Sequence, residues 1–362
     1  MNADADATRA GAGAVAEPAR HAGGDAWADR SRVYVVVLNW NGSSDTEQCV
    51  RSLLALNHPN YCILVCDNQS QPADLAATRG WGSGLPGGLQ ELCADQWPVH
   101  PGATTLAHRQ VLLLHTGGNL GFAGGVNVGL RFARAQPDMA FAWILNNDTT
   151  VDADALQALV DRATTDSRIG ICGSTLIYNH NRDIIQALGG ARYNRWRARS
   201  AAVGAFEPAS GIPDDPSSVE RSLAYVNGAS MLVSKDFLDS VGPMEESYFL
   251  YSEEHDWAQR GVQLGYQLAY APKSMVFHKH GASIGTSASG GSALSLYYLY
   301  RNKALFAARH HRETLAVSLL SLTWEGLKFL LKGQPAKSRW VIAGLVDFAK
   351  GKVGKSFPNR AT

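Results

Sequence analysis

Short apolar runs alternate with helical segments between residues 33 and 148, and this alternation constrains the fold more than any other feature of the chain. Continuous runs rich in β-branched residues are typical of strands that are buried on both faces. The apolar runs lie at residues 33–38, 62–66, 111–114 and 140–145, and the intervening helices are expected at 45–56, 73–79 and 126–135. The pattern predicts an α/β fold with a doubly wound, mainly parallel sheet, flanking helices and right-handed crossovers.

Polar side chains follow each of these predicted strands. The residues concerned are Asn39, Asn41, Asp67, Asn68, Asn119, Asn147 and Asp148. A single polar strand end is ordinary turn chemistry. Ligands of doubly wound sheets bind outside the carboxyl ends of the strands, so four polar ends along one rim indicate a binding site.

Two of these strand ends carry more specific patterns. The glycine-rich stretch 117–125 lacks the Gly-Lys-Ser/Thr of a P-loop and is not a clean GxGxxG, so it fits either a phosphate-proximal loop or a simple tight turn. The stretch 146–148 ends in a carboxylate, Asp148, that can hold a hard divalent cation. The alternative is a helix cap, a role for which Asp152 is better placed.

The densest acidic cluster lies at residues 252–257 and contains Glu253, Glu254 and Asp256. Carboxylates this close repel one another, which raises at least one pKa unless a cation or donor compensates. Such a cluster can be a general base, a metal site or an acidic helix start. His278 and His280 follow a short apolar run, and a metal-ligand role and a structural role are equally open for them.

Composition excludes several other classes of protein. The formal net charge is +1, which argues against a nucleic-acid-coating protein. The five cysteines are odd in number and form no CxxC pair, which favours reduced thiols in the cytoplasm over a zinc or disulfide scaffold. Residues 1–30 are rich in Ala, Gly and Asp and lack a secretory apolar core, so we expect a disordered N-terminal extension.

The charge is unevenly distributed along the chain. Residues 301–362 contain 12 Lys/Arg and 3 Asp/Glu, whereas the rest of the chain contains 21 and 29. The apolar stretch 313–332 lies within this basic region, and its longest uncharged run, Thr314–Trp324, is too short for a membrane span. Residues 313–355 therefore suit a basic amphipathic element lying on anionic lipid, or else helices that pack on the catalytic domain or a partner chain.

Taken together, the ordered motifs resemble the family 2 glycosyltransferases, which have the nucleotide-sugar-binding GT-A fold. The resemblance runs from Val33 to Asn302. It rests on VVLNWNG (36–42), DNQS (67–70), GNLGFAGG (118–125), LNND (145–148), NGASM (227–231), FLYSEEHDW (249–257) and FH (277–278). The combination of NLGFAGG with EExDW is similar to the rhamnosyltransferases of bacterial surface polysaccharides.

This resemblance implies a role for each polar strand end. Asn39 and Asn41 would line the nucleotide, Asp67 would bond the pyrimidine base, and Asn68 would lie beside it. Asn119, Gly121 and Asn127 would lie along the ribose and diphosphate, and Asn147 belongs to the same nucleotide-sugar site. Asp148 matches the last acid of the metal-binding Asp-x-Asp motif, whose first acid is replaced by Asn146, and His278 matches a histidine ligand of Mg²⁺ or Mn²⁺. Glu254 falls at the catalytic base, with Asp256 and Glu253 as alternatives.

The implied enzyme is an inverting glycosyltransferase that moves rhamnose from dTDP-rhamnose to a saccharide or lipid-linked acceptor. A dTDP- or UDP-linked donor of another sugar (galactofuranose, glucose or an amino sugar) is the first alternative, and a non-catalytic nucleotide-sugar-binding domain is the second. The catalytic domain would span 31–290, with a nucleotide-binding half at 31–150 and an acceptor half at 151–290. Residues 291–362 would form a helical extension, on the inner face of the plasma membrane. The sequence leaves open whether the chain forms a homo-oligomer.

Overall fold

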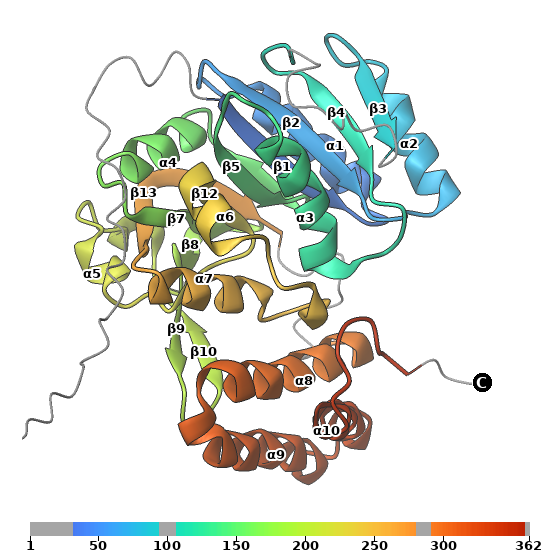
Figure 1. Cartoon of the computed structure of the whole chain (residues 1–362), viewed down its shortest axis with the longest axis vertical. Helices are drawn as coiled ribbons and strands as arrows, with labels where there is room; N and C mark the ends of the chain where they lie inside the picture. Colours follow the sequence, from blue (N-terminus) through green and yellow to red (C-terminus); the bar gives the residue numbers. More distant parts are fainter. Residues whose placement is uncertain (1–31, 94–105, 280–290, 359–362) are drawn as a thin grey trace, which may run out of the picture.

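The computed structural model describes residues 32–93, 106–279 and 291–358. The predicted extension at residues 1–30 lies outside the described residues, as does His280. Within the described part, one large sheet is covered by helices on both faces, and a layer of three helices lies below it in Figure 1.

The first half of the chain follows the predicted alternation of strands and helices. Its elements are β1 (Arg32–Asn39), α1 (Ser43–Leu54), β2 (Tyr61–Asp67), α2 (Pro72–Gly82), β3 (Leu89–Cys93), β4 (Val111–His115), α3 (Gly121–Arg134) and β5 (Met139–Asn146). Each of the four predicted strands is present, and each is longer at one end or both than its apolar run.

The second half of the chain is less regular. Its elements are β6 (Thr149–Val151), α4 (Ala155–Ala163), β7 (Ile169–Tyr178), β8 (Asn181–Leu188), β9 (Gly190–Asn194), β10 (Arg199–Ala202), α5 (Ser217–Glu220), β11 (Tyr225–Val226), β12 (Ser230–Ser234), α6 (Lys235–Val241), α7 (Glu253–Gln263) and β13 (Gln267–His278). Short 3₁₀ turns lie at Ala209–Gly211 and Glu246–Tyr248.

The strands of the large sheet run in the order β3-β4-β2-β1-β5-β12-β7-β13-β6, and β8 pairs with β7. The pairs from β3 to β5 are all parallel, and so is the pair β7–β13, whereas β12, β6 and β8 are antiparallel to their neighbours. The prediction of a mainly parallel α/β sheet is therefore confirmed. Strands from both halves of the chain share this one sheet, which puts their ends at a common rim.

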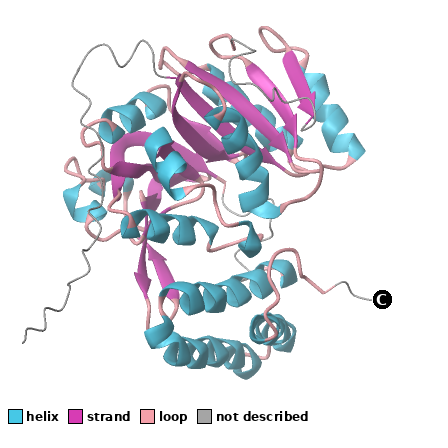
Figure 2. Ribbon diagram, in the orientation of Figure 1, coloured by secondary structure: helices cyan, strands magenta, loops and turns pink. Residues whose placement is uncertain are grey.

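Helices cover both faces of the large sheet (Figure 2). Side chains of β1 alternate between two cores, one on each face of the sheet. Val35 and Val37 pack with residues of α1 and α4, whereas Tyr34 and Val36 pack with residues of α3, α6 and α7. Because both faces are covered, the strand reads as a continuous apolar run and not as an alternating one.

Several elements differ from the predictions. β3 lies in the stretch 80–108 that lacks strand patterning, because it is a half-exposed edge strand with no apolar run. The hairpin β9–β10 lies outside the four apolar runs from which strands were predicted. α3 begins at Gly121 and not at Val126. Glycines disfavour a helix, but in α3 they let the helix approach the sheet closely. An added β-carbon at Gly125 would overlap the Leu38 side chain.

Three helices form the C-terminal layer: α8 (Ala293–His310), α9 (Leu315–Leu331) and α10 (Pro335–Ala349). A shared apolar cluster of Tyr297, Tyr298, Trp340 and Val341 joins α8 to α10 and reaches Phe249 of the large domain. This layer therefore packs directly on the part of the chain that precedes α7.

Of the described residues, the stretch Arg312–Leu331 is long and apolar enough for a membrane span by length and composition. It has 20 residues, a mean hydropathy of 1.3, and 22% of its most apolar window buried within the protein. The run Thr314–Trp324 considered in the sequence is shorter than this stretch, because it contains only uncharged residues. The helix continues through Glu325 and Lys328, since neither side chain breaks a helix.

Candidate active site

The carboxyl ends of β1, β2, β4 and β5 lie at one rim of the sheet. The register pairs Asn39 with Asp67, Asp67 with His115, and Leu38 with Asn146. The polar residues that follow these strands are thus brought side by side, as the sequence predicts. Parallel pairing is the cause, because it places equivalent strand ends at the same edge.

Asn39 and Asn147 are held in a buried network at this rim. The Asn39 side chain donates to Asp67 Oδ1 at 3.3 Å and accepts from the Thr46 hydroxyl at 2.9 Å, and Asn147 Nδ2 donates to the same hydroxyl at 3.0 Å. Both asparagines are buried. Their contacts fix the loop at the start of α1. The two buried asparagines therefore support the predicted nucleotide site.

Asn41 and Asp67 lie at the edge of the same network. Asn41 is exposed, has a left-handed φ of 54°, and accepts from the backbone N–H of Gln71 at 2.7 Å. Asp67 Oδ2 accepts from the backbone N–H of Ser70 at 3.2 Å. These bonds hold the loops after β1 and β2 against each other, and Asn41 is the member of the pair that solvent reaches.

The glycine-rich loop is fixed by Asn68 and Asn119. Asn68 donates to the Gly121 carbonyl at 3.1 Å and accepts from the Leu120 N–H at 3.0 Å, while Asn119 Oδ1 accepts from the Gly121 N–H at 3.1 Å. Gly121 has a φ of +74°, and an added β-carbon there would overlap the Phe249 carbonyl oxygen. The glycine is therefore needed for a close backbone approach between this loop and the chain before α7.

Asn127 lies in α3 and has a different role from the one predicted. Its side chain donates to the Met244 carbonyl at 2.9 Å and to Glu246 Oε1 at 2.9 Å, and it accepts from the Met244 N–H at 3.0 Å. The residue is completely buried. These bonds make Asn127 a positioning residue for the segment 244–246, which corrects the expectation that it lies along a ribose or diphosphate.

Asp148 and His278 come together although 130 positions separate them. β6 pairs with β13, so that His278 lies opposite Thr149, and His278 Nε2 is 3.1 Å from Asp148 Oδ1. Both side chains are buried, and His278 Nδ1 lies 2.9 Å from Gln186 Oε1. No local pattern marked Gln186, because its place beside His278 depends on the pairing of β7 with β8 and β13.

The pair of Asp148 and His278 fits a cation that is also bound by a diphosphate. Within residues 32–93, 106–279 and 291–358, no group of three or more His, Cys, Asp or Glu side chains could hold a metal ion alone. Mg²⁺ is usually held by one or two carboxylates together with substrate phosphates and waters. Neighbouring ligands of an octahedral ion lie about 3 Å apart, close to the 3.1 Å seen here. Asn146 adjoins the pair but contributes no charge.

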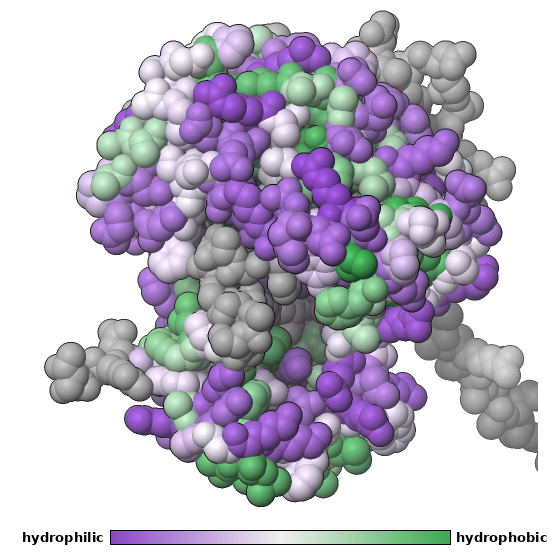
Figure 3. Space-filling model, turned by 180° about the vertical axis from the view of Figure 1, so that it is seen from behind, coloured by the Kyte–Doolittle hydropathy of each residue, from purple (hydrophilic) through white to green (hydrophobic). Residues whose placement is uncertain are grey.

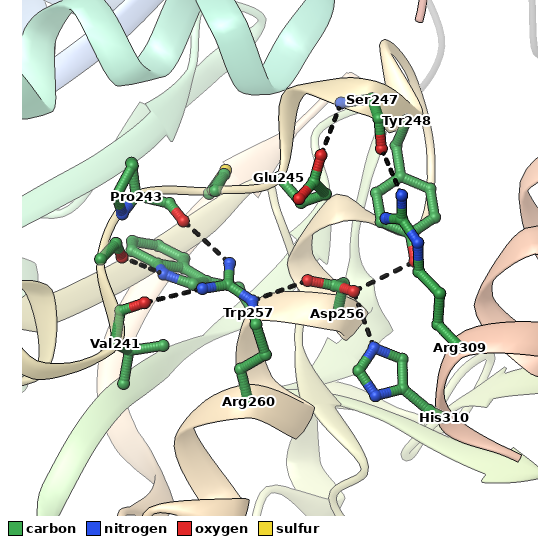
Figure 4. A network of polar contacts seen from close by, with 12 residues as sticks. Val241, Pro243, Glu245, Ser247, Tyr248, Asp256, Trp257, Arg260, Arg309 and His310 are labelled. Carbon is green, nitrogen blue, oxygen red and sulfur yellow. Dashed lines mark hydrogen bonds and ion pairs between the residues drawn. The ribbon is translucent and has the colours of Figure 1, made fainter. Parts of the chain in front are cut away.

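The three acids of the cluster have different environments, and Asp256 is the one tied into the protein (Figure 4). Its carboxylate accepts from His310 at 2.7 Å, from Arg260 at 2.8 Å and from the Tyr248 hydroxyl at 3.1 Å. Burial alone would raise the pKa of Asp256, but the bonds from His310 and Arg260 outweigh it and the pKa is lowered. Asp256 is therefore an ion-paired link between α7 and α8, which argues against it as a base.

Glu253 and Glu254 open α7 beside this link. Glu253 is 3% exposed, its Oε2 has no hydrogen-bond partner among the described residues, and burial followed by the charge of Glu254 raises its pKa well above the usual range. Glu254 is half-buried and lines a pocket, and burial raises its pKa as well. Of the three acids, Glu254 combines access to a pocket with a pKa suited to accepting a proton.

A turn at residues 227–229 connects the two parts of the site. The Asn146 N–H donates to the Ala229 carbonyl at 3.1 Å, and a β-carbon at Gly228 would lie 3.9 Å from the Glu254 carboxyl carbon. The NGASM motif thus passes between the strand end that carries Asp148 and the start of α7. Because Gly228 has no side chain, nothing at this position stands between the turn and the Glu254 carboxyl group.

The backbone before α7 is strained and is held by α8. Phe249, Tyr251 and Ser252 have φ values of 64°, 69° and 76°, a region that side chains disfavour. Asn302 donates to the carbonyls of Leu250 and Tyr248 at 2.6 and 2.7 Å. Through these bonds α8 fixes the loop that presents Glu254.

This chain is similar to known glycosyltransferases in sequence and in fold. An M. tuberculosis protein named N-acetylglucosaminyl-diphospho-decaprenol L-rhamnosyltransferase is 26% identical over 234 residues, covering 59% of this chain and 68% of its own length. The mannosyltransferase PcManGT of Pyrobaculum calidifontis, solved with GDP-Man and Mn²⁺, superposes with a TM-score of 0.53 at 15% identity and covers 89% of this chain and 88% of its own. S. aureus TarS, solved with UDP-GlcNAc, has a TM-score of 0.51 at 12% identity and covers 89% and 81%.

Residues 30–290 match the sequence model described as "Glycosyltransferase like family 2". That range contains the whole large sheet, the rim of strand ends, the Asp148–His278 pair and the acidic start of α7. The solved structures share the fold, and the relative is similar in sequence across more than half of the chain. The chain is therefore a member of glycosyltransferase family 2, with a GT-A fold and rhamnosyltransferase-like sequence motifs.

Proposed function

We propose that this glycosyltransferase moves a sugar from a nucleotide diphosphate to an acceptor hydroxyl with inversion, and that Glu254 is the base. The observation that carries this proposal is the difference between the three acids. Asp256 is ion-paired, Glu253 is enclosed, and Glu254 lines a pocket. A single base suits direct displacement, whereas a glycosidase needs two carboxylates that flank the scissile bond.

Each group at the site has a defined task in this reaction. The Glu254 carboxylate takes the proton of the acceptor hydroxyl as that oxygen attacks the anomeric carbon. Asp148 and His278 would hold Mg²⁺ or Mn²⁺, whose charge offsets the negative charge that develops on the leaving diphosphate. Asn41, Asp67 and the loop at Asn119–Gly121 would border the nucleotide, and buried Asn39, Asn68 and Asn147 keep those segments in place.

The donor we propose is dTDP-rhamnose, with a lipid-linked saccharide as acceptor in bacterial surface polysaccharide synthesis. Support comes from the M. tuberculosis relative, whose name specifies rhamnosyl transfer to a diphospho-decaprenol-linked sugar. The structural neighbours were solved with GDP-Man or UDP-GlcNAc, so the GT-A fold accommodates other donors. A UDP-linked donor of galactofuranose, glucose or an amino sugar is the alternative that the experiment must separate.

A lipid-linked acceptor places the enzyme at the cytoplasmic face of the membrane, and α9 offers a surface for that contact. Five of its exposed large apolar side chains recur every three or four residues: Val317, Leu320, Trp324, Leu327 and Leu331. Leu330 is exposed beside them. In Figure 3 apolar residues gather at the lower end of the molecule, where Figure 1 places α9. Trp324 with Lys328 over its ring at 5.9 Å suits an interface of anionic lipid.

Donor hydrolysis tests the proposed function without knowledge of the acceptor. We expect the purified chain to hydrolyse dTDP-rhamnose slowly with Mg²⁺ or Mn²⁺, and to hydrolyse UDP- and GDP-sugars much less. Asp148→Ala should abolish transfer and remove the effect of metal on donor binding, measured by calorimetry. Full activity in EDTA would contradict the metal assignment, and preference for a UDP-sugar would identify the alternative donor.

A further inference from the structure

A pocket of about 220 Å³ opens directly beside Glu254. Its walls come from the hairpin β9–β10, from β11, from the start of α7 and from α8, so it forms only where the C-terminal layer meets the large domain (Figure 1). The residues that matter for its chemistry are Tyr193, Tyr225, Glu254, His255 and Lys303. The pocket lies on the α8 side of Glu254, whereas the strand-end rim that would hold the nucleotide is formed by β1, β2, β4 and β5.

Lys303 places a cation in this pocket without a protein counter-ion. Its ammonium forms no salt bridge or hydrogen bond with any described residue, and it lies 5.1 Å from the centre of the Tyr300 ring. The acid whose charge acts on Lys303, Glu325, is already bound by Arg199 at 3.2 Å and by the Tyr300 hydroxyl at 2.8 Å. Burial lowers the pKa of Lys303, which is the expected cost of enclosing an unpaired ammonium.

Other lining residues of the pocket are aromatic, and one of them carries a hydroxyl without a hydrogen-bond partner among the described residues. His255 stacks between Phe306, at 3.8 Å between ring centres, and Tyr225, at 4.6 Å. The Tyr193 ring packs against His255 at 4.5 Å, and its hydroxyl is buried with no partner among the described residues. A rigid aromatic wall beside an unpartnered hydroxyl is suited to a sugar ring, which has both apolar faces and hydroxyl groups.

We infer that this pocket is the acceptor site and that Lys303 recognises a phosphate group carried by the acceptor sugar. The inference rests on the proposed function, because it takes Glu254 as the base. A bound phosphate would supply the counter-charge that Lys303 lacks, while the sugar lies along the aromatic wall with its hydroxyl toward Glu254. Lys303 is thus a specificity-determining residue that selects phosphate-linked acceptors over neutral saccharides.

Two matched ligands test this role. We would measure the binding of farnesyl-diphospho-N-acetylglucosamine and of the uncharged farnesyl N-acetylglucosaminide by calorimetry, with wild-type protein and variants. Wild type should bind the charged ligand roughly 10- to 100-fold more tightly, as expected for one charge-assisted contact. Lys303→Met should lose this preference and Lys303→Arg should retain most of it. Lys273→Met, which removes an exposed lysine of β13, is the matched control.

The same variants distinguish the source of the phosphate that Lys303 binds. Affinity for dTDP should be unchanged in Lys303→Met, because donor and acceptor occupy different sites. A weaker affinity for dTDP would show that Lys303 serves the donor and would overturn the inference. Retention of the charged-ligand preference by a folded Lys303→Met would also overturn it. Absence of donor hydrolysis by wild type would instead contradict the proposed function.

Discussion

At the scale of single residues, the start of α7 shows how neighbouring carboxylates acquire different chemistry. Residues 253, 254 and 256 share one helical turn, yet Glu253 is enclosed with an unpartnered Oε2 among the described residues, Glu254 lines a pocket, and Asp256 belongs to an ion-pair network. Proximity in sequence predicted repulsion among the three acids. The structure relieves part of it because Arg260 forms an ion pair with Asp256 and His310 hydrogen-bonds to it, which leaves the raised pKa values on Glu253 and Glu254.

Replacement of individual acids should separate catalysis from folding. Glu254→Gln keeps the shape of the side chain but cannot accept a proton, so we expect kcat to fall roughly 10²- to 10⁴-fold with donor affinity nearly unchanged. Asp256→Asn breaks a buried ion pair and should cost about 3 kcal/mol of folding free energy, seen as a lower melting temperature. The reverse assignment would follow if Asp256→Asn lost only turnover while Glu254→Gln remained active.

The same two residues predict the pH dependence of the enzyme. The pKa of Glu254 is raised, so its base form is lost as pH falls through a value above that of an ordinary glutamate, and kcat should decline there. The pKa of Asp256 is lowered, so its contribution to stability is present above the unfolded value and is lost only as pH falls through the lower folded value. Turnover should thus decline at a pH where circular dichroism still reports a folded protein. An identical decline in the residual activity of Glu254→Gln would refute this assignment.

At the scale of elements, the glycine-rich loop and the chain before α7 form a single support. The Phe122 N–H donates to the Phe249 carbonyl at 2.7 Å, and Asn302 of α8 holds the carbonyls on either side. These carbonyls, in the chain before α7, therefore join that chain to α3 and α8, which are far apart in the sequence. This joint positions the loop of the predicted nucleotide site relative to Glu254.

Two glycines in the same loop provide a matched test of this joint. Gly117 and Gly121 both have a left-handed φ, of 79° and 74°, but only at Gly121 would a β-carbon meet other atoms. We expect Gly117→Ala to cost about 1 kcal/mol of folding free energy through backbone strain alone. Gly121→Ala should cost several times more and should also reduce turnover, since it forces the loop away from Phe249. Equal effects in denaturant titrations would show that backbone strain, and not the close approach, accounts for both.

At the scale of the whole molecule, the C-terminal layer has two distinct surfaces. Its inner surface packs on the large domain, where Arg301 donates to the Tyr248 carbonyl at 2.8 Å and Tyr297 and Tyr298 are fully buried. Its outer surface is the exposed side of α9, on which Leu320 is 72% and Trp324 is 52% exposed. The two alternatives drawn from the sequence, a membrane surface and packing on protein, therefore apply to different faces of the layer.

The outer surface of α9 predicts binding to anionic lipid. The double variant Leu320→Asp/Trp324→Asp should reduce cosedimentation with phosphatidylglycerol-containing vesicles at least about tenfold, because two apolar side chains no longer enter the interface. Leu264→Asp, which changes an exposed leucine beyond the end of α7, should have no effect. Unchanged vesicle binding, together with a shift from dimer to monomer in gel filtration, would show that this face binds a second copy of the chain.

The sequence by itself determined the fold class and the composition of the rim. Buried strands need continuous apolar runs, and the loops after them need polar and glycine residues, so local patterns were enough to place Asn39, Asp67, Asn119 and Asp148 at strand ends. The strands β3 and β8 are partly exposed and β10 is fully exposed, so they lack such runs and were missed for that reason.

Tertiary structure alone decided which of these residues act together. The pairing of β6 with β13 brings His278 to Asp148, and the packing of α8 against α7 pairs His310 with Asp256 while leaving Glu254 beside a pocket. Asn127 looked like a ligand residue until its partners in the segment 244–246 were known. These outcomes depend on contacts between segments more than 50 residues apart, and the protonation and access of a side chain follow from such neighbours and not from its own place in the sequence.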